Sequence, residues 1–394
     1  MRTADELELS GKKVVKRVDI NLPLDEKGEV VENPRLRRHA ESILKLSEQG
    51  AKVVVLAHQG RAGKADFKTL EGHAHLLERR VGKQVLYAPA VDAGKVREEV
   101  GRLKSGDILL LENVRMWGNE EQEIGRSELV RALAENGEVF LLGALSVAHR
   151  PHASVIGLSK HLPSAAGYVL KSELDALQRM EGGETLLVIG GGKVKESLMI
   201  IAKWLAEGKA SKVLVGGAVA ALFLYAQGKR TPETNEYLEE TGANEHAAEA
   251  KRLLERYEER ILIPMDVALN VEDERVEAPV SALEKGGIYD IGEKTVERYA
   301  EEILGAKRIF VNGPMGVYEK KSFGLGTKKV LEAIAESNAY SLVGGGHTIT
   351  ALEQFGIPEK RFGYVSLSGK ALIEYLSGKE LPGLKALKEN RLSL

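Results

Sequence analysis

The chain has 394 residues, more than the roughly 250 to 300 that one hydrophobic core supports, so we expect two domains. Lysine plus arginine (56) and aspartate plus glutamate (58) nearly cancel to a net charge of -2, which excludes an overall field for nucleic acid or anionic lipid. The absence of cysteine excludes disulfides and thiolate metal sites, and it fits a reducing compartment, with the cytoplasm expected. No apolar run approaches the roughly 20 residues of a membrane helix, so no membrane partner is expected. The 29% of charged residues hints at a heat-stable protein.

Short apolar runs alternate with longer amphipathic stretches along the whole chain. The predicted strands are "KVVVLAH", "DILLLE", "EVFLLG", "TLLVIGGG", "KVLVGG", "RILIP", "RIFVNG" and "YSLVGGG". They are continuously apolar rather than alternating, which is typical of parallel sheets covered on both faces, so we expect a doubly wound α/β fold. Residues 165–183 have helical periodicity without a strand, and we interpret them as the joint between two halves.

The strand ends of the first half carry polar and cationic side chains. Ligands of open α/β sheets bind beyond the carboxyl ends of the strands. The residues at these ends are Arg17, Asp19, Asn21, His58, Arg61, Arg115, His149, Arg150 and His152, and Arg35 follows at a helix start. A single arginine is more often a solvated surface charge, but the set predicts a site for a small polyanion.

The strand ends of the second half carry glycine. Three loops, at 188–197, 214–223 and 342–350, let the backbone approach a phosphate and precede a helix whose free N–H groups favour anions. Tight turns or close packing are the alternative. None of the loops fits a P-loop or a dinucleotide fingerprint. Lys193 follows one loop, and "RIFVNGPMGVYE" adds Glu319, either a ligand for ribose hydroxyls or a surface acid.

One half thus suits a small polyanion and the other a nucleotide, which together predict phosphoryl transfer. We expect Lys193 and Arg35 to be the cations at the moving phosphoryl group. "HAH" at 73–75 is interpreted as surface, because residues two apart do not share a helix face.

The sequence resembles the phosphoglycerate kinase family, with the archaeal branch most similar. The motifs are "RVDINLP", "LAHQGR", "LLLENVR", "AHRPHAS", "GGGKV", "DIG", "VNGPMGVYE", "GLGT" and "SGKELPG". The resemblance implies two Rossmann-like domains: 1–164 for 3-phosphoglycerate and 184–371 for ATP or ADP with Mg²⁺, joined by a helix at 165–183. Residues 372–394 would return to the first domain, and hinge bending would close the two halves. The sequence does not decide whether the protein is a monomer or a homodimer, or which nucleotide base it prefers.

The resemblance also implies roles for individual residues. Asp19 and Asn21 would meet the glycerate end of the acceptor, and Arg35 the transition state. The remaining acceptor residues would be His58, Gln59, Gly60, Arg61, Arg115 and Arg150. Lys193 would balance charge on the transferred group. The remaining nucleotide residues would be Gly192, Gly217, Asn312, Pro314, Glu319, Gly344, Gly345, Gly346, His347 and Thr348.

Several positions depart from the family pattern. His347 replaces an aspartate that helps to hold magnesium, so Mg²⁺ would be held by nucleotide phosphates and water, while His347 donates to a phosphate or caps the helix. The segment "LGAL" at 142–145 lacks the two polar residues that the family has beside the acceptor site. Ser368 and Lys370 replace glycines, and they would either crowd the moving phosphoryl group or add a cation. Smaller departures are Ala62, Ala218, Val311 and Glu293. They leave a second hypothesis, a divergent paralogue that phosphorylates another small carboxylate or binds both ligands without turnover.

Overall fold

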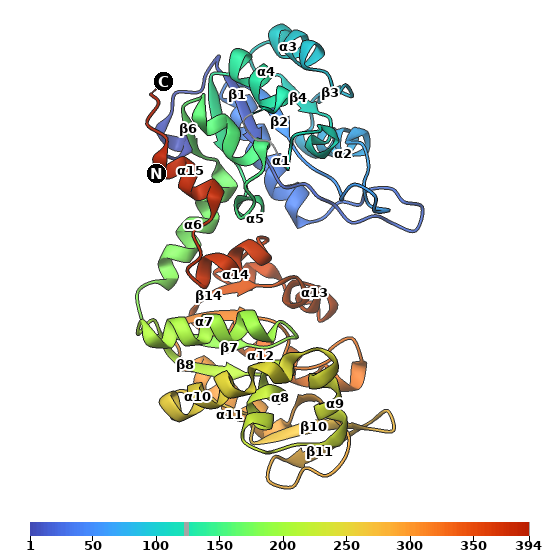
Figure 1. Ribbon diagram of the computed structural model, residues 1–394, viewed down its shortest axis with the longest axis vertical. Coiled ribbons are helices and arrows are strands. Elements are labelled where there is room, and N and C mark those ends of the chain that lie inside the picture. The colour runs from blue at the N-terminus through green and yellow to red at the C-terminus, as the bar shows by residue number, and fades with distance from the viewer. Residues whose placement is uncertain (122–125, 394) are drawn as a thin grey trace. The chain divides into compact units, whose positions relative to one another are not determined.

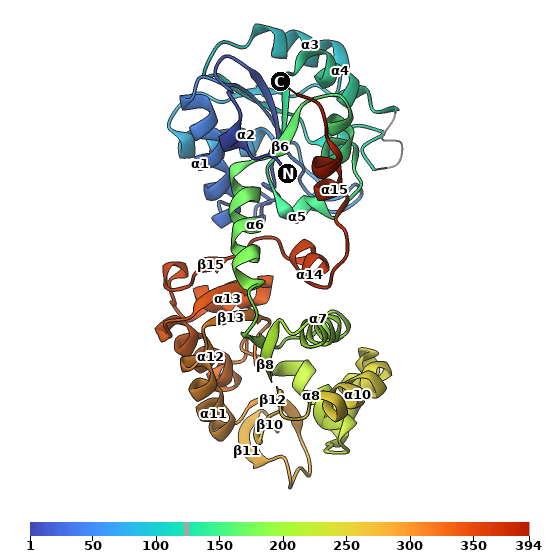
Figure 2. The ribbon, with the colours of Figure 1, turned by 90° about the vertical axis from the view of Figure 1, so that its left-hand side faces the viewer.

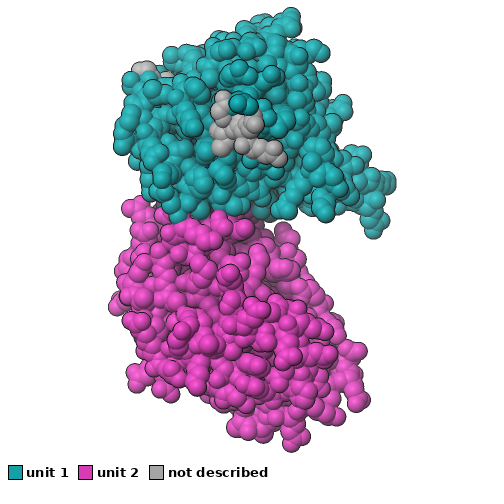
Figure 3. Space-filling view, in the orientation of Figure 1, with its two compact units in different colours: residues 1–174, 380–394 teal, residues 175–379 magenta. Residues whose placement is uncertain are grey.

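The computed structural model describes residues 1–121 and 126–393, and they form two compact units (Figure 3). Unit 1 consists of Met1–Leu174 and Glu380–Leu394, and unit 2 of Asp175–Lys379. The division falls within helix α6 (Tyr168–Met180), in the segment where the sequence predicts the joint. No helix of the described ranges is both long and apolar enough to span a membrane.

The core of unit 1 is a parallel sheet in the order β3-β4-β2-β1-β5-β6. Its strands are β1 (Lys13–Arg17), β2 (Lys52–Leu56), β3 (Leu86–Ala88), β4 (Ile108–Leu111), β5 (Val139–Leu142) and β6 (Ser164–Ala166). Every residue of β4 and β5 is buried, as continuous apolar runs predict. The strand β6 lies at the start of the 165–183 segment, where no strand was expected; with three small residues it has too little apolar pattern to be recognised.

Helices cover both faces of the unit 1 sheet (Figure 2). They are α1 (Pro34–Glu48), α2 (Glu71–Val81), α3 (Ala93–Arg102), α4 (Glu128–Asn136), the single turn α5 (Leu145–Ala148) and α15 (Pro382–Glu389). Helices α1 and α2 pack on one face and α3 and α4 on the other, which is the arrangement that right-handed crossovers give for this strand order. The side chain of Asn33 caps α1 by accepting from the amide of Leu36 at 3.1 Å, and this holds Arg35 in the first turn.

Unit 2 is built on a second parallel sheet in the order β15-β14-β13-β7-β8-β9. Its strands are β7 (Thr185–Ile189), β8 (Ala210–Val215), β9 (Ile261–Leu262), β13 (Arg308–Asn312), β14 (Tyr340–Gly344) and β15 (Tyr364–Val365). Its helices are α7 (Val194–Ala206), α8 (Gly217–Ala226), α9 (Pro232–Glu240), α10 (Ala247–Tyr257), α11 (Glu293–Leu304), α12 (Leu325–Glu336), α13 (Gly346–Gln354) and α14 (Lys370–Leu376). Helices α7, α8 and α10 lie on one face and α11, α12 and α13 on the other (Figures 1 and 2). The doubly wound α/β fold predicted from the sequence is therefore confirmed in both units.

A small antiparallel sheet, in the order β11-β10-β12, extends unit 2 and was not predicted. It contains β10 (Asp266–Val271), β11 (Glu274–Pro279) and β12 (Gly287–Ile291). Glu272 and Asp273 form the two-residue turn of the β10-β11 hairpin, with φ of 54° and 67°. Most of β11 is exposed and polar, so it lacks the apolar run by which the other strands were recognised.

Short helical turns complete the structure. They are η1 (Ala4–Glu6), η2 (Val114–Met116), η4 (Ala153–Gly157), η5 (Leu158–Lys160), η6 (Ala243–His246), η7 (Lys321–Phe323) and η8 (Glu359–Arg361). Two of them matter for the site in unit 1, because η2 carries Arg115 and η4 carries Ser154.

Candidate active site

The cationic residues predicted in the first half come together at the carboxyl edge of the unit 1 sheet. Asp19 and Asn21 follow β1, residues 58–61 follow β2, Arg115 follows β4 and Arg150 follows β5 and α5. Parallel strands end on the same side of a sheet, so these loops are neighbours. The amide of Gly60 donates to Oδ1 of Asn21 at 2.8 Å, which ties the first two loops together.

Asp19 and Arg35 form an ion pair at this edge. The Asp19 carboxylate is buried, lies 3.4 Å from the Arg35 guanidinium and accepts a hydrogen bond from the Ser146 hydroxyl. Burial alone raises the pKa of Asp19, but the Arg35 guanidinium and the hydrogen bond from Ser146 lower it below the ordinary value. Asp19 is therefore an anion that orients the Arg35 side chain.

Arg115 and Arg150 form a partly buried cationic pair. Burial lowers the pKa of Arg150, and the charges of Arg115 and Arg61 lower it further. Burial also lowers the pKa of Arg115, against the opposing effect of Glu121, whose carboxylate lies 3.1 Å from Nε. Arg115 also donates to the carbonyl of Gly60, while Arg61 is exposed. Mutual repulsion of these guanidinium groups is relieved by a bound anion, so the geometry suits a phosphate.

Gln59 has a structural place rather than the expected contact with the acceptor. Its side chain is fully buried, accepts from the amide of Leu22 at 2.8 Å and donates to the carbonyls of Leu22 and Asp66. His73 lies 3.0 Å from the same amide oxygen and is also fully buried, so its interpretation as a surface residue is wrong. His75 is exposed, and the helix α2 turns only one of the two histidines inward.

The segment 142–145 lies in the core. Leu142 and Leu145 are buried, and Gly143 donates to the carbonyl of Arg17 at 2.7 Å. The polar contact near the acceptor residues comes instead from the next residue, Ser146, which binds Asp19. Sequence reasoning missed Ser146, because a lone serine in a short apolar turn carries no distinct signal.

The glycines after β7 and β8 serve close packing of loops. The amide of Gly191 donates to the carbonyl of Pro314 at 2.8 Å, and that of Gly217 to Met315 at 2.7 Å. A Cβ on Gly217 would lie 2.7 Å from the amide nitrogen of Gly191, and one on Gly313 only 2.2 Å from the carbonyl oxygen of Gly190; both glycines have positive φ. At these two loops the lack of a Cβ permits close packing, as the packing alternative expects, while contact of Gly192 and Gly217 with a nucleotide stays a prediction.

The loop after β14 has a different character. Helix α13 begins at Gly346, so the amides of its first turn have no acceptor within the helix, and a Cβ on Gly346 would meet no atom within 4 Å. His347 lies inside this turn with its side chain 74% exposed, so it is not the cap, which is Gly345. Thr348 is buried and accepts from the amide of Gly313 at 2.8 Å, which makes it a structural residue.

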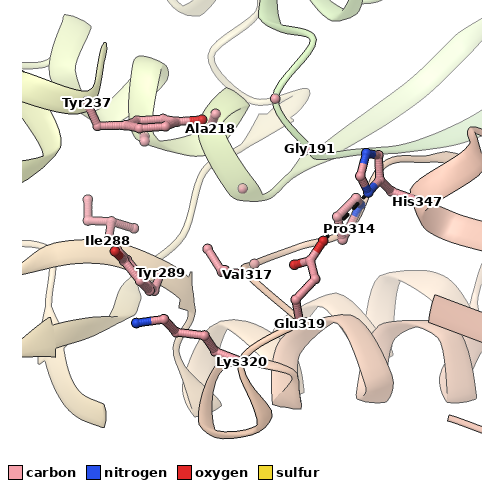
Figure 4. Close-up of a pocket in the computed structure, with 14 residues that line it drawn as sticks. Gly191, Ala218, Tyr237, Ile288, Tyr289, Pro314, Val317, Glu319, Lys320 and His347 are labelled. Atoms are coloured by element: carbon pink, nitrogen blue, oxygen red, sulfur yellow. Dashed lines mark ion pairs between the residues drawn. The ribbon is translucent and has the colours of Figure 1, made fainter. Parts of the chain in front are cut away.

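A pocket of about 420 Å³ lies next to these loops in unit 2 (Figure 4). Five of the predicted nucleotide residues line it: Gly192, Gly217, Pro314, Glu319 and His347. Glu319 and His347 face each other across its edge, with 3.6 Å between the carboxylate and Nδ1. The other predicted nucleotide residues, Lys193, Asn312, Gly344, Gly345, Gly346 and Thr348, are not among its lining residues. Lys193 is exposed at the start of α7, directly after Gly192.

Most of the rest of the lining was not predicted. The residues concerned are Ala218, Ala221, Tyr237, Ile288, Tyr289, Gly316, Val317 and Lys320, all of them uncharged except the lysine. Gly316 and Val317 lie within the "VNGPMGVYE" motif and could have been found there. Ile288 and Tyr289 belong to β12 of the unpredicted antiparallel sheet. An aromatic and aliphatic end beside a glycine-rich end suits the base and the phosphates of a nucleotide.

Ser368 and Lys370 precede and begin the short helix α14. Ser368 is 4% exposed, and its amide donates to the Ser366 hydroxyl at 3.2 Å. Lys370 is 68% exposed, with its amine 3.7 Å from Glu374. The serine is thus packed within unit 2, and the lysine is oriented by a carboxylate on its own helix.

Comparison with known proteins extends over nearly the whole chain. The sequence model of the phosphoglycerate kinase family matches residues 4–379. The chain is 39% identical to the phosphoglycerate kinase of Methanosarcina mazei, covering 98% of this chain and 94% of the relative. It is also 39% identical to that of Methanothermobacter thermautotrophicus, covering 99% and 97%. The chain belongs to the phosphoglycerate kinase family. The predicted resemblance is confirmed, and the activity class of this family is that of a kinase, a phosphotransferase.

Solved structures of the phosphoglycerate kinase family have the same fold. The crystal structure of phosphoglycerate kinase from Pyrococcus horikoshii OT3 has a TM-score of 0.89 at 32% identity, over 98% of both chains. The structure of phosphoglycerate kinase from Coxiella burnetii has a TM-score of 0.81 at 31% identity, again over 98% of both. These matches favour the main hypothesis and give no support to a divergent paralogue.

Proposed function

We propose that the protein transfers a phosphoryl group reversibly between ATP and the carboxylate of 3-phosphoglycerate, which gives 1,3-bisphosphoglycerate and ADP. The observation that carries this proposal is the arginine cluster at the carboxyl edge of the unit 1 sheet, in a chain of the phosphoglycerate kinase family. Burial and mutual repulsion prepare Arg115 and Arg150 for a phosphate dianion.

The acceptor is bound in unit 1. Arg61, Arg115 and Arg150, with His58, hold its phosphate, while Asn21 and the Asp19–Arg35 pair face its glycerate end. Arg35 is the more mobile member of that pair, because 31% of its side chain is exposed against 5% for Asp19. It turns from Asp19 toward the phosphoryl group as negative charge develops there.

The nucleotide is bound in unit 2. Its base lies against Tyr237, Tyr289 and Val317, its ribose hydroxyls donate to Glu319, and its phosphates face the first turn of α13. Lys193 reaches the transferred group from the start of α7. Mg²⁺ would enter bound to the nucleotide phosphates and water, because His347 stands where the family has a magnesium-holding aspartate and Mg²⁺ prefers oxygen ligands.

A carboxylate oxygen of the acceptor attacks the γ-phosphorus in line, the bond from that phosphorus to the bridging oxygen breaks, and ADP leaves. The reacting atoms must approach to about 3 to 3.5 Å, so units 1 and 2 must come together during turnover. Small-angle scattering tests this step. An unchanged radius of gyration on addition of both ligands would exclude domain closure.

A coupled assay with 3-phosphoglycerate and Mg-ATP tests the activity itself. We expect turnover in the range of ordinary kinases, about 1 to 100 per second, and a slower rate contradicts the proposal. Glycerate without its phosphate is the matched control. Its kcat/KM falls at least about a hundredfold if the arginine cluster recognises that phosphate.

A further inference from the structure

Four buried residues form a continuous hydrogen-bonded chain beneath the acceptor residues of unit 1. The Glu120 carboxylate accepts from the Ser154 hydroxyl at 2.5 Å and from its amide at 3.0 Å. The same hydroxyl accepts from Nε of Arg17 at 2.8 Å, and Nη2 of Arg17 lies 3.2 Å from Nδ1 of His58. All four side chains are at most 4% exposed. The chain thus runs from a buried carboxylate to a histidine of the acceptor site.

The direction of each hydrogen bond in this chain is determined. A guanidinium has only donors, so Nε of Arg17 donates to the Ser154 oxygen and Nη2 donates toward His58. The Ser154 hydroxyl has one hydrogen, which it gives to Glu120, so its oxygen accepts from Arg17. The Nδ1 of His58 faces a donor and must therefore accept. The hydrogen of the neutral ring is then on Nε2, the nitrogen on the other side of the ring.

The charge around His58 supports a neutral ring. Burial and then Arg17 lower the pKa of His58 well below its ordinary value, and Arg115 and Arg150 lower it further, against the effect of Asp19. A neutral imidazole has one N–H, so the nitrogen that carries it decides whether the ring donates to an anion.

We propose that Glu120 and Ser154 are positioning residues, which hold Arg17 so that His58 stays in the Nε2–H form and donates to the phosphate of the acceptor. This inference rests on the proposed function. It assigns a purpose to Arg17, which is buried and bonds to Ser154, to the carbonyl of Val18 and to His58. The hydrogen-bonded chain runs from Glu120, after η2, through η4 and β1 to the loop after β2, so the fold of four segments determines one hydrogen position.

Nitrogen NMR of the ligand-free protein tests the proposal. In protein labelled with ¹⁵N-histidine, with His58 assigned from the loss of its signals in H58N, we expect hydrogen on Nε2 and none on Nδ1. The key variant is R17K, which keeps the positive charge but cannot bond Ser154 and His58 together. It is expected to populate the Nδ1–H form. An Nδ1–H ring in the wild type, or an unchanged ring in R17K, overturns the proposal.

Kinetics give a second measurement. R17K, S154A and E120Q are each expected to raise KM for 3-phosphoglycerate about tenfold with a smaller change in kcat, since a hydrogen bond to the bound anion is weakened. S159A is the matched control. It removes another buried serine hydroxyl of the same region, bonded to the carbonyl of Ile156 at 2.8 Å, and leaves KM and the tautomer unchanged.

The two measurements also separate the proposals. Absence of turnover in the wild type would contradict the proposed function and leave the tautomer result standing. Should S154A lose stability while both the His58 ring and KM stay as in the wild type, the role of Ser154 is structural only and the positioning proposal is wrong.

Discussion

The proposed acceptor site in unit 1 and the proposed nucleotide pocket in unit 2 would use different parts of the chain to receive negative charge. In unit 1 we expect cationic side chains to meet it, two of them, Arg115 and Arg150, partly buried. In unit 2 it is met by the first turn of α13 and by loops packed so closely that a Cβ would not fit. Side chains can recognise a small phosphate by its shape, but their burial is costly. A site made of backbone amides avoids the free-energy cost of burying charged side chains, but it depends on close packing of its loops.

The largest effect is expected from the side chains. R35M should lower kcat about a thousandfold, because Arg35 stabilises charge that develops in the transition state. The control is R37M on the same helix, whose guanidinium lies 3.8 Å from Glu32. It should keep wild-type kcat in the coupled assay. A loss in R35M that appears only in KM would place Arg35 in ground-state binding.

Buried charge in unit 1 should also be visible as pH-dependent stability. Lys16 in β1 is fully buried and donates to the Ser42 hydroxyl; burial, with Lys45 as a lesser cause, lowers the pKa of Lys16 from 10.5 to about 7. Between these values the unfolded chain binds a proton that the folded protein does not, so wild-type stability rises with pH.

The double variant K16M/S42A removes both partners. It should be more stable than the wild type by about 3 kcal/mol at pH 7 in urea unfolding, and the difference should shrink as the pH approaches 10.5. A difference that does not change with pH would mean that Lys16 is charged in the folded protein.

In the closely packed loops of unit 2, we expect adding a methyl group to a glycine to reduce stability. G313A places a Cβ 2.2 Å from the carbonyl oxygen of Gly190 at a φ of 87°, and we expect it to lower the free energy of unfolding by about 2 kcal/mol and to weaken nucleotide binding. G346A is the control, since its Cβ would enter open space, and its unfolding free energy should change by less than about 1 kcal/mol. Equal losses in both variants would contradict the packing argument.

The smallest effect is expected at Glu319, the acidic residue of the pocket that we propose to bind the ribose. E319Q should raise KM for ATP about tenfold, because an amide is a weaker acceptor for ribose hydroxyls than a carboxylate. E332Q on α12, whose carboxylate pairs with Lys329 at 3.1 Å, should leave KM unchanged. If E319Q binds ATP as the wild type does, Glu319 serves only to orient His347.

The sequence predicted parallel strands that are covered on both faces and therefore apolar throughout, such as β4 and β7. It did not predict the parallel strands β3, β6 and β15, which are only two or three residues long. It did not predict β10, β11 and β12, because an antiparallel sheet with an exposed polar strand lacks that pattern. This missed sheet is important for the site, because β12 carries two residues that line the pocket, Ile288 and Tyr289.

The cationic residues of unit 1 could be predicted because they close apolar strands, and a strand end fixes position without knowledge of packing. What each does there could not be predicted. Arg17, Gln59 and Arg61 all lie at or just after the end of a strand, so the sequence does not distinguish them. In the structure Arg17 and Gln59 are buried and bonded to the protein, while Arg61 is exposed. Similarly, glycine runs look the same whether they admit a ligand or another loop, and the close packing around Gly191 and Gly217 became visible only in the structure.

Unit 1 contains residues from both ends of the numbering, and Asn390 joins them. Its side chain accepts from Arg2 at 2.6 Å and from the amide of Ser164 at 3.1 Å, and it donates to the carbonyls of Ser159 and Leu162. During translation, residues 175–379 leave the ribosome before Asn390 does. Unit 1 therefore lacks the helix α15 and this clamp until the last residues of the chain are made, so the domain whose synthesis begins first is completed last.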